Sequence, residues 1–399
     1  MKRSAFVLGV LVLLLPLSAV AQFPSADELL EKSLAAQQKG DYNGALQFLN
    51  QAVQAYPDSL PVRMRRLGFL EQIQGRGGSE DANRWIQGAL VDDLRALARL
   101  APDGREGGIA RDALAKIEGR ELFPAPKVSC PDGAAVAMAE AERLLNARKM
   151  RESIPLYKKA VELCPDEPVF WVHYADAYYA LGEYGEARTL FEKGLAKAPW
   201  YAPGHRFLSD ALAKSQDWEG GYHEAVLAVL SDPTYEAGWL TLRDFITGRD
   251  GVWQRAYGDK PQVKTDGGNV NLSLPADLSA NRPDGPEWIA YGLFKVGADL
   301  PAPGEKKPAK AAPKTPLERE RVAVLGVLET RRSQSAKPSP FWDMMDRAER
   351  AGFLDEAIYL HLLDEELVSG YREHREKNRE RLVRYVETVL APLPPRPKG

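Results

Sequence analysis

The stretch WVHYADAYYALGEYGEARTLFEKGLAKAP, residues 171–199, decides the fold. Trp171, Tyr174 and Tyr178 follow one helical pattern, and Ala187 and Phe191 begin a second. Pro199 ends the second helix, because proline cannot continue a helix. The same helix-ending proline recurs along the chain at a constant spacing of 34 residues: Pro131, Pro165, Pro199 and Pro233. A fixed period of this length predicts a stack of helical hairpins.

These residues resemble the tetratricopeptide repeat, in which Tyr174 replaces the usual leucine and Ala175 the usual glycine. The resemblance implies an all-α solenoid over residues 131–248, with Trp171, Tyr174, Tyr178 and Phe191 in its core. A further repeat is expected in residues 22–58, where Ala45, Leu49 and Pro57 occupy the characteristic offsets. Solenoids of this kind hold a partner in a concave groove, so the resemblance also implies protein binding.

The rest of the chain departs from this period. Residues 22–122 form an N-terminal helical region, and its part from 60 to 122 is either a degenerate repeat or an insertion. Residues 249–300 are expected to be irregular, with one strand-like alternation at 270–274. Residues 301–315 form a linker of lysine, proline and alanine, residues 316–391 a C-terminal helical module, and residues 392–399 a proline-rich tail.

The first 21 residues resemble a secretory signal peptide. Lys2 and Arg3 precede the apolar run Phe6–Leu17, and Ala19-Val20-Ala21 is a small-x-small cleavage site. The alternative is an uncleaved anchor. The signal predicts an exported protein, and its style suggests the periplasm of a bacterial envelope. With 53 basic and 56 acidic residues, the chain lacks the positive charge expected of a nucleic-acid-binding protein.

The two cysteines, Cys130 and Cys164, are separated by the same 34-residue step, and each directly precedes a repeat proline. They bracket one predicted hairpin and would lie at its open end. Export would bring them into oxidising conditions, so a disulfide is expected. The alternative is two thiols standing about 8–10 Å apart, as equivalent ends of neighbouring helices can.

An acidic residue recurs at the ninth position of each repeat. Counted from Ala134, Pro168, Ala202 and Glu236, these positions hold Glu142, Asp176, Asp210 and Asp244. Stacked repeats would bring the four carboxylates into one column on the concave surface, where a basic peptide would gain charge-assisted hydrogen bonds. The alternative is a column of ordinary solvated polar residues. The acidic charge disfavours the clamp for a peptide's C-terminal carboxylate that is known in this family.

Further candidate contacts surround this column. Tyr179 is expected on the groove side of its helix, Tyr235 borders the groove at a repeat junction, as Trp200-Tyr201 does, and Arg206 and Lys214 add positive charge. Aromatic residues and arginine are the usual energetic anchors of interfaces. For each aromatic residue, packing between repeats is the alternative.

The sequence contains none of the motifs that would indicate catalysis or metal binding. Its five histidines include no pair at the four-residue spacing of a helical zinc motif, and neither a phosphate-binding loop nor a nucleophile elbow is present. We therefore expect no cofactor, no metal and no enzymatic activity. The expected role is a protein-binding scaffold of the cell envelope. The alternatives are a self-assembling structural component, or an enzyme whose site lies in residues 249–399.

Overall fold

The computed structural model describes residues 24–73, 80–101, 104–119, 121–253, 260–266, 269–273, 284–298, 314–334 and 337–395. The predicted signal peptide, residues 301–313 of the predicted linker and residues 396–399 of the predicted tail lie outside these ranges. The chain forms two compact units, residues 1–110 and 111–399. Among the described residues, no helix is both long enough and apolar enough to cross a membrane.

The first unit is built from antiparallel helices. They are α1 (Ala26–Gln38), α2 (Tyr42–Ala55), α3 (Leu60–Ile73), α4 (Glu80–Leu100) and the beginning of α5 (Arg105–Ile117), which ends in the second unit. Ala45 and Leu49 of α2 pack against Phe69 of α3 in a buried cluster. Between α3 and α4, the buried Asp93 accepts hydrogen bonds from Arg63 at 2.8 Å and Arg66 at 2.7 Å. This pairing satisfies charges that would be costly to bury alone.

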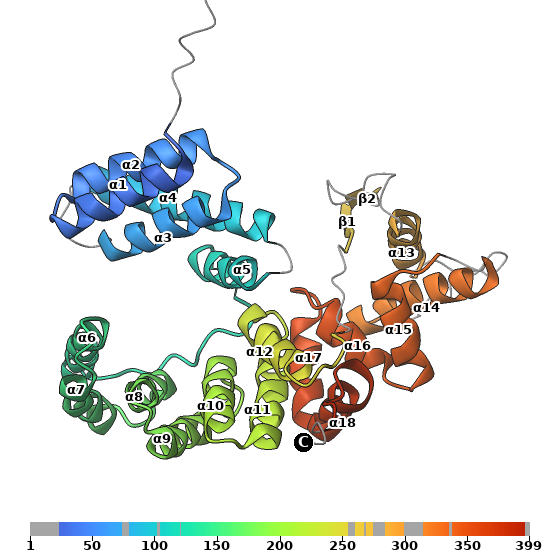
Figure 1. The fold of residues 1–399 in the computed structure, drawn as a ribbon. Coiled ribbons are helices and arrows are strands. Elements are labelled where there is room, and N and C mark those ends of the chain that lie inside the picture. Colours follow the sequence, from blue (N-terminus) through green and yellow to red (C-terminus); the bar gives the residue numbers. More distant parts are fainter. Residues whose placement is uncertain are drawn as a thin grey trace, which may run out of the picture. The chain divides into compact units, whose positions relative to one another are not determined.

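The second unit begins with a stack of helical hairpins. Its helices are α6 (Asp132–Asn146), α7 (Met150–Leu163), α8 (Pro168–Ala180), α9 (Tyr184–Lys197), α10 (Ala202–Lys214), α11 (Trp218–Ser231) and α12 (Glu236–Thr247). Figure 1 shows α6, α8, α10 and α12 along the inner side of an arc, with α7, α9 and α11 along its outer side. The inner helices therefore form a concave face.

Small and aromatic residues alternate in the core of this stack. Ala160, Ala175 and Ala187 are fully buried and let neighbouring helices approach closely. Tyr157 of α7 stacks on Tyr174 of α8, with ring centroids 6.4 Å apart. At the open end of the first hairpin, Cys130 and Cys164 form a disulfide with their Cα atoms 5.5 Å apart. This bond ties the chain just before α6 to the end of α7.

The remainder of the second unit is helical apart from one antiparallel hairpin, β1 (Gln262–Asp266) with β2 (Asn269–Ser273). The helices are α13 (Gly285–Gly297), α14 (Pro316–Gln334), α15 (Pro340–Arg350), α16 (Leu354–His361), α17 (Val368–Lys377) and α18 (Arg379–Tyr385), followed by a π-helix, η1 (Val386–Leu390). The overall class is therefore all-α.

One turn geometry recurs in both the stack and the C-terminal helices. Gly182, between α8 and α9, has φ +77°, and its N–H donates to the Tyr179 carbonyl. The N–H of Glu183 reaches back to the Tyr178 carbonyl, completing a Schellman cap. Gly352, between α15 and α16, has φ +78° and the same pair of backbone hydrogen bonds. The pair α15–α16 is thus joined by the same turn as the hairpins of the stack.

A single hydrophobic core joins the end of the stack to the C-terminal helices. Trp239 of α12 lies in one buried cluster with Trp342 of α15 and Tyr371 of α17. The Tyr371 hydroxyl donates to the Leu230 carbonyl at 2.6 Å, and the Tyr222 hydroxyl donates to the Ala391 carbonyl at 2.8 Å. The C-terminal helices therefore cover the last hairpin of the stack.

Alternating arginine side chains and aromatic rings also connect the segment before α6 to the C-terminal helices. In order, Arg372, Phe123, Arg375, Trp200 and Arg379 lie one upon the next, with guanidinium-to-ring-centroid distances of 5.3, 5.1, 4.8 and 5.1 Å. We call these five residues the cation–aromatic ladder. It holds the extended segment before α6 and the junction between α9 and α10 against α17 and α18.

Candidate functional site

The concave face carries a connected group of charged and aromatic side chains. Glu142 on α6 accepts hydrogen bonds from the Tyr157 hydroxyl at 2.5 Å and from Nδ1 of His173 at 2.9 Å. Burial acts to raise the pKa of Glu142, but these two bonds outweigh it and hold the pKa below its usual value. Glu142 is therefore an ionised carboxylate whose hydrogen bonds are largely made within the protein.

Arg206 and Asp210 form a second pair, on α10. Arg206 Nη2 donates to Asp210 Oδ2 at 3.0 Å, and the guanidinium also hydrogen-bonds to Tyr235. Burial acts to lower the pKa of Arg206, but Tyr235 and Asp210 raise it above its usual value. The Nε of Arg206 is buried and makes no hydrogen bond. This arginine therefore keeps its charge next to the acidic column and joins α10 to the start of α12.

Asp176 lies on α8 between these two pairs and differs from both. It is half-buried and makes neither a hydrogen bond nor an ion pair with any other described residue. Burial raises its pKa, His173 and Arg206 act to lower it, and Glu142 and Asp210 raise it further. A carboxylate held partly out of water without a partner is a place where an incoming cation gains most.

The other predicted contacts are distributed unevenly. Burial and then Asp210 raise the pKa of Tyr179, which shares this electrostatic environment. Tyr235 is half-buried and points its hydroxyl at Arg206. Lys214 is exposed at the end of α10, and Asp244 is exposed at the far end of α12, 3.1 Å from Arg243. The structure thus brings Glu142, Asp176, Tyr179, Arg206, Asp210 and Tyr235 into one network and leaves Lys214 and Asp244 apart from it.

Three side chains of this group, Tyr157, His173 and Asp112, were not predicted as site residues from the sequence. His173 stands three residues before Asp176, so the helical period places it on the same face, and this signal could have identified it. Asp112, in the second half of α5, contributes to the rise in the Tyr235 pKa, and no local pattern marks it. Among the described residues, no group of three histidine, cysteine or acidic side chains could hold a metal ion.

Comparison with known families agrees with this architecture. A tetratricopeptide-repeat family model matches residues 144–209, and a second matches residues 29–59. Two separate stretches of the chain thus match tetratricopeptide-repeat models, and the predicted fold class, an all-α solenoid of helical repeats, is confirmed. Repeats of this class commonly present a concave surface to a partner. No curated protein matches the chain.

Several solved structures are similar to part of the chain. The first tetratricopeptide-repeat domain of Spaghetti (RPAP3), bound to the HSP90 peptide SRMEEVD, is 20% identical, covers 28% of this chain and 89% of its own, and has a TM-score of 0.27. The TPR2AB domain of yeast Sti1 in its pHSP90 complex is 17% identical, with 54% and 81% covered and a TM-score of 0.26. YrrB, described as having an unusual peptide-binding site, is 12% identical, with 55% and 93% covered and a TM-score of 0.24.

Proposed function

We propose that this protein is a non-enzymatic scaffold of the cell envelope whose concave face holds a basic segment of a partner protein. The observation that carries the proposal is Asp176, the half-buried carboxylate without a partner at the centre of the inner face. A lysine or arginine of the partner would pair with it. Tyr179 and the paired Asp210 border the same place and would contribute contact area and further acceptors.

The charges around Asp176 favour a cationic partner over an anionic one. Three carboxylates lie along α6, α8 and α10, and Arg206 is already engaged with Asp210 and Tyr235. An incoming carboxylate would face this negative column without a free arginine to receive it. An incoming ammonium or guanidinium would instead relieve the repulsion among Glu142, Asp176 and Asp210.

Two observations support a place in the cell envelope. The predicted signal peptide would export the chain, and a disulfide between Cys130 and Cys164 suits an oxidising compartment such as the periplasm. Measuring whether the protein fractionates with periplasmic contents, and whether residues 1–21 are removed, tests this part of the proposal.

The groove is tested by crosslinking in cells. A photo-reactive residue replaces Tyr179, and the captured proteins are compared between the wild-type background and an Asp176→Asn, Asp210→Asn background. Asparagine keeps the shape and removes the charge. Each charge-assisted hydrogen bond contributes about 1.5–3 kcal/mol, so capture should fall by about tenfold or more.

The matched control is Asp166→Asn, which neutralises an exposed carboxylate that pairs with Lys197 at a repeat junction. Capture should be unchanged in this variant. A partner that crosslinks equally well without Asp176 and Asp210 would contradict the groove assignment. Recovery of the protein alone would favour self-assembly over a scaffold for another protein.

A further inference from the structure

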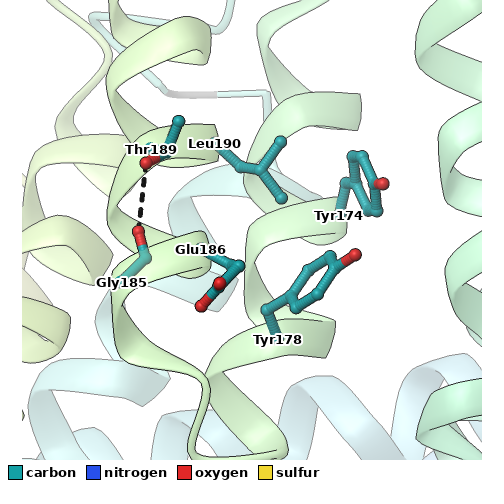
Figure 2. A pocket seen from close by; sticks show the side chains of 6 residues that line it. All are labelled: Tyr174, Tyr178, Gly185, Glu186, Thr189 and Leu190. Atoms are coloured by element: carbon teal, nitrogen blue, oxygen red, sulfur yellow. Dashed lines mark hydrogen bonds between the residues drawn. The ribbon is translucent and has the colours of Figure 1, made fainter.

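A pocket opens on α8 and α9, on the side of α8 away from the concave face. Six residues line it: Tyr174, Tyr178, Gly185, Glu186, Thr189 and Leu190. Its volume is about 220 Å³. Figure 2 shows the two tyrosine rings on one side and the Glu186 carboxylate on the other. The pocket is therefore a small open cavity with an aromatic wall and an acidic rim.

The pocket and the concave face are separate surfaces of one helix. Tyr174 and Tyr178 are four residues apart and lie about 40° from each other around the axis of α8. Asp176 is two residues from each of them and lies about 160° away. A ligand in the pocket therefore does not touch the acidic column, and the two surfaces can be tested independently.

The aromatic wall is fixed by its neighbours. Tyr174 is 8% exposed, stacks on Tyr157, and lies 5.6 Å from the Tyr178 ring, centroid to centroid. Burial first, and then the Tyr178 hydroxyl and the negative Glu162 carboxylate, raise the pKa of Tyr174 to about 12. The Tyr174 phenol is therefore neutral at pH 7.

The acidic rim is available to a ligand. Glu186 is exposed and makes neither a hydrogen bond nor an ion pair with any described residue. Thr189, by contrast, donates its hydroxyl to the Gly185 carbonyl at 3.1 Å. Leu190, 9% exposed, supplies apolar surface. The cavity therefore offers ring surface, an apolar side chain and one free negative charge.

We propose that this pocket binds an alkylammonium group. The cation would lie between the tyrosine rings and the Glu186 carboxylate, with its carbon atoms against Leu190. Aromatic surface together with a carboxylate is the chemistry that recognises substituted ammonium ions. The same group could come from a free amine or from a lysine side chain of a protein.

Titration of the full-length protein with tetramethylammonium chloride, followed by backbone amide NMR, tests the proposal. Sodium chloride at equal ionic strength is the salt control, and tert-butanol is the uncharged analogue. A saturable shift of the Gly185 amide is expected, with a dissociation constant on the order of 1 mM. The uncharged analogue should bind at least fivefold more weakly. A peptide containing one lysine, titrated in parallel, separates the two sources of the ammonium.

Variants decide which residues hold the ligand. Glu186→Gln and Tyr178→Leu should each weaken tetramethylammonium binding about fivefold or more. Glu192→Gln, which removes another exposed α9 carboxylate, one already paired with Arg188, should leave it unchanged. Glu186 is exposed, so its variant is expected to fold even if Tyr178→Leu does not. Equal binding of the uncharged analogue, or shifts confined to Asp176 and Asp210, would overturn this proposal without affecting the proposed function.

Discussion

Asp112, in the second half of α5, accepts a hydrogen bond from the backbone N–H of Glu236 at 2.8 Å and another from Ala237 at 3.0 Å. These are the first two N–H groups of α12, whose own N-cap residue, Tyr235, makes no capping bond through its side chain. A carboxylate from a distant part of the chain therefore caps this helix. The two hydrogen bonds hold the second half of α5 beside the last hairpin of the stack.

Removing this cap should destabilise the second unit. Asp112→Ala leaves the N–H groups of Glu236 and Ala237 without their acceptor, which costs about 1 kcal/mol for a helix cap. Urea unfolding monitored by circular dichroism measures the change. Asp112→Asn retains one acceptor oxygen and should cost less than Asp112→Ala. Equal stability of the alanine variant and the wild type would contradict this role.

The same residue should make stability depend on pH near neutrality. Burial, opposed by the two backbone hydrogen bonds, raises the pKa of Asp112 to about 7, and the nearby Glu236 and Asp232 add to the rise. A carboxyl whose pKa is raised on folding binds its proton more tightly in the folded state. The stabilisation of the folded state by protonated Asp112 is therefore complete below about pH 4 and is lost as the pH rises through about 7. The free energy of unfolding, measured for wild type and Asp112→Asn from pH 4 to 8, should show wild type losing stability relative to the variant. Parallel profiles would refute the assignment.

Alanine substitutions at two glycines near the same turn should change the stability in opposite directions. Gly182 has φ +77°, a conformation that costs an alanine about 1–2 kcal/mol. Gly185, three residues on, is helical and has open space where a Cβ would be added, so Gly185→Ala should stabilise by up to about 1 kcal/mol. Thermal unfolding of the two single variants checks the sign of each effect.

Loss of the bond between Cys130 and Cys164 should lower stability substantially. The bond closes a loop over a sequence separation of 34 residues, which corresponds to about 4 kcal/mol in the chain-entropy model. A variant with serine at both positions, unfolded beside wild type with and without a reducing agent, measures the difference. Reductant should destabilise the wild type and leave the serine variant unchanged. A wild type that unfolds identically under both conditions would argue against the bond.

The cation–aromatic ladder should be sensitive to the loss of one of its two rings, Phe123. Phe123→Ala removes the surface on which Arg372 and Arg375 lie and should cost about 2 kcal/mol. Phe123→Leu keeps apolar contact while removing the ring, and should cost about half as much. Hydrogen exchange of the α17 amides reports whether the loss is local to this junction.

The repeat architecture was predictable because its signals are local. Within each hairpin, a turn residue, a small residue such as Ala187 and a terminal proline such as Pro199 recur at fixed spacing, and together they specify two helices and their crossing. The pair α15–α16 carries no complete repeat pattern in its sequence, although Gly352 and Ala357 repeat the spacing of Gly182 and Ala187. Its second helix has only 8 residues, so no full repeat pattern follows.

The candidate site was predictable only in part. The ninth-position acids and Tyr179 follow from the repeat register, because stacked helices bring equivalent positions together. Asp112 does not follow from it, since 124 residues separate it from Glu236. The two partners of Glu142 differ in how far the sequence could predict them. His173 could be placed, because it shares a helix face with Asp176. Tyr157 could not, because its contact with Glu142 depends on packing between helices.

The core shared by Trp239, Trp342 and Tyr371 also limits how copies of this protein could associate. An array of hairpins lengthens by laying a new hairpin on an exposed terminal one, and here the terminal hairpin lies beneath the molecule's own C-terminal helices. An open-ended fibre needs two complementary free faces on every copy. Because the chain's own C-terminal helices cover the face beyond α12, that face is not open to a hairpin from a second copy.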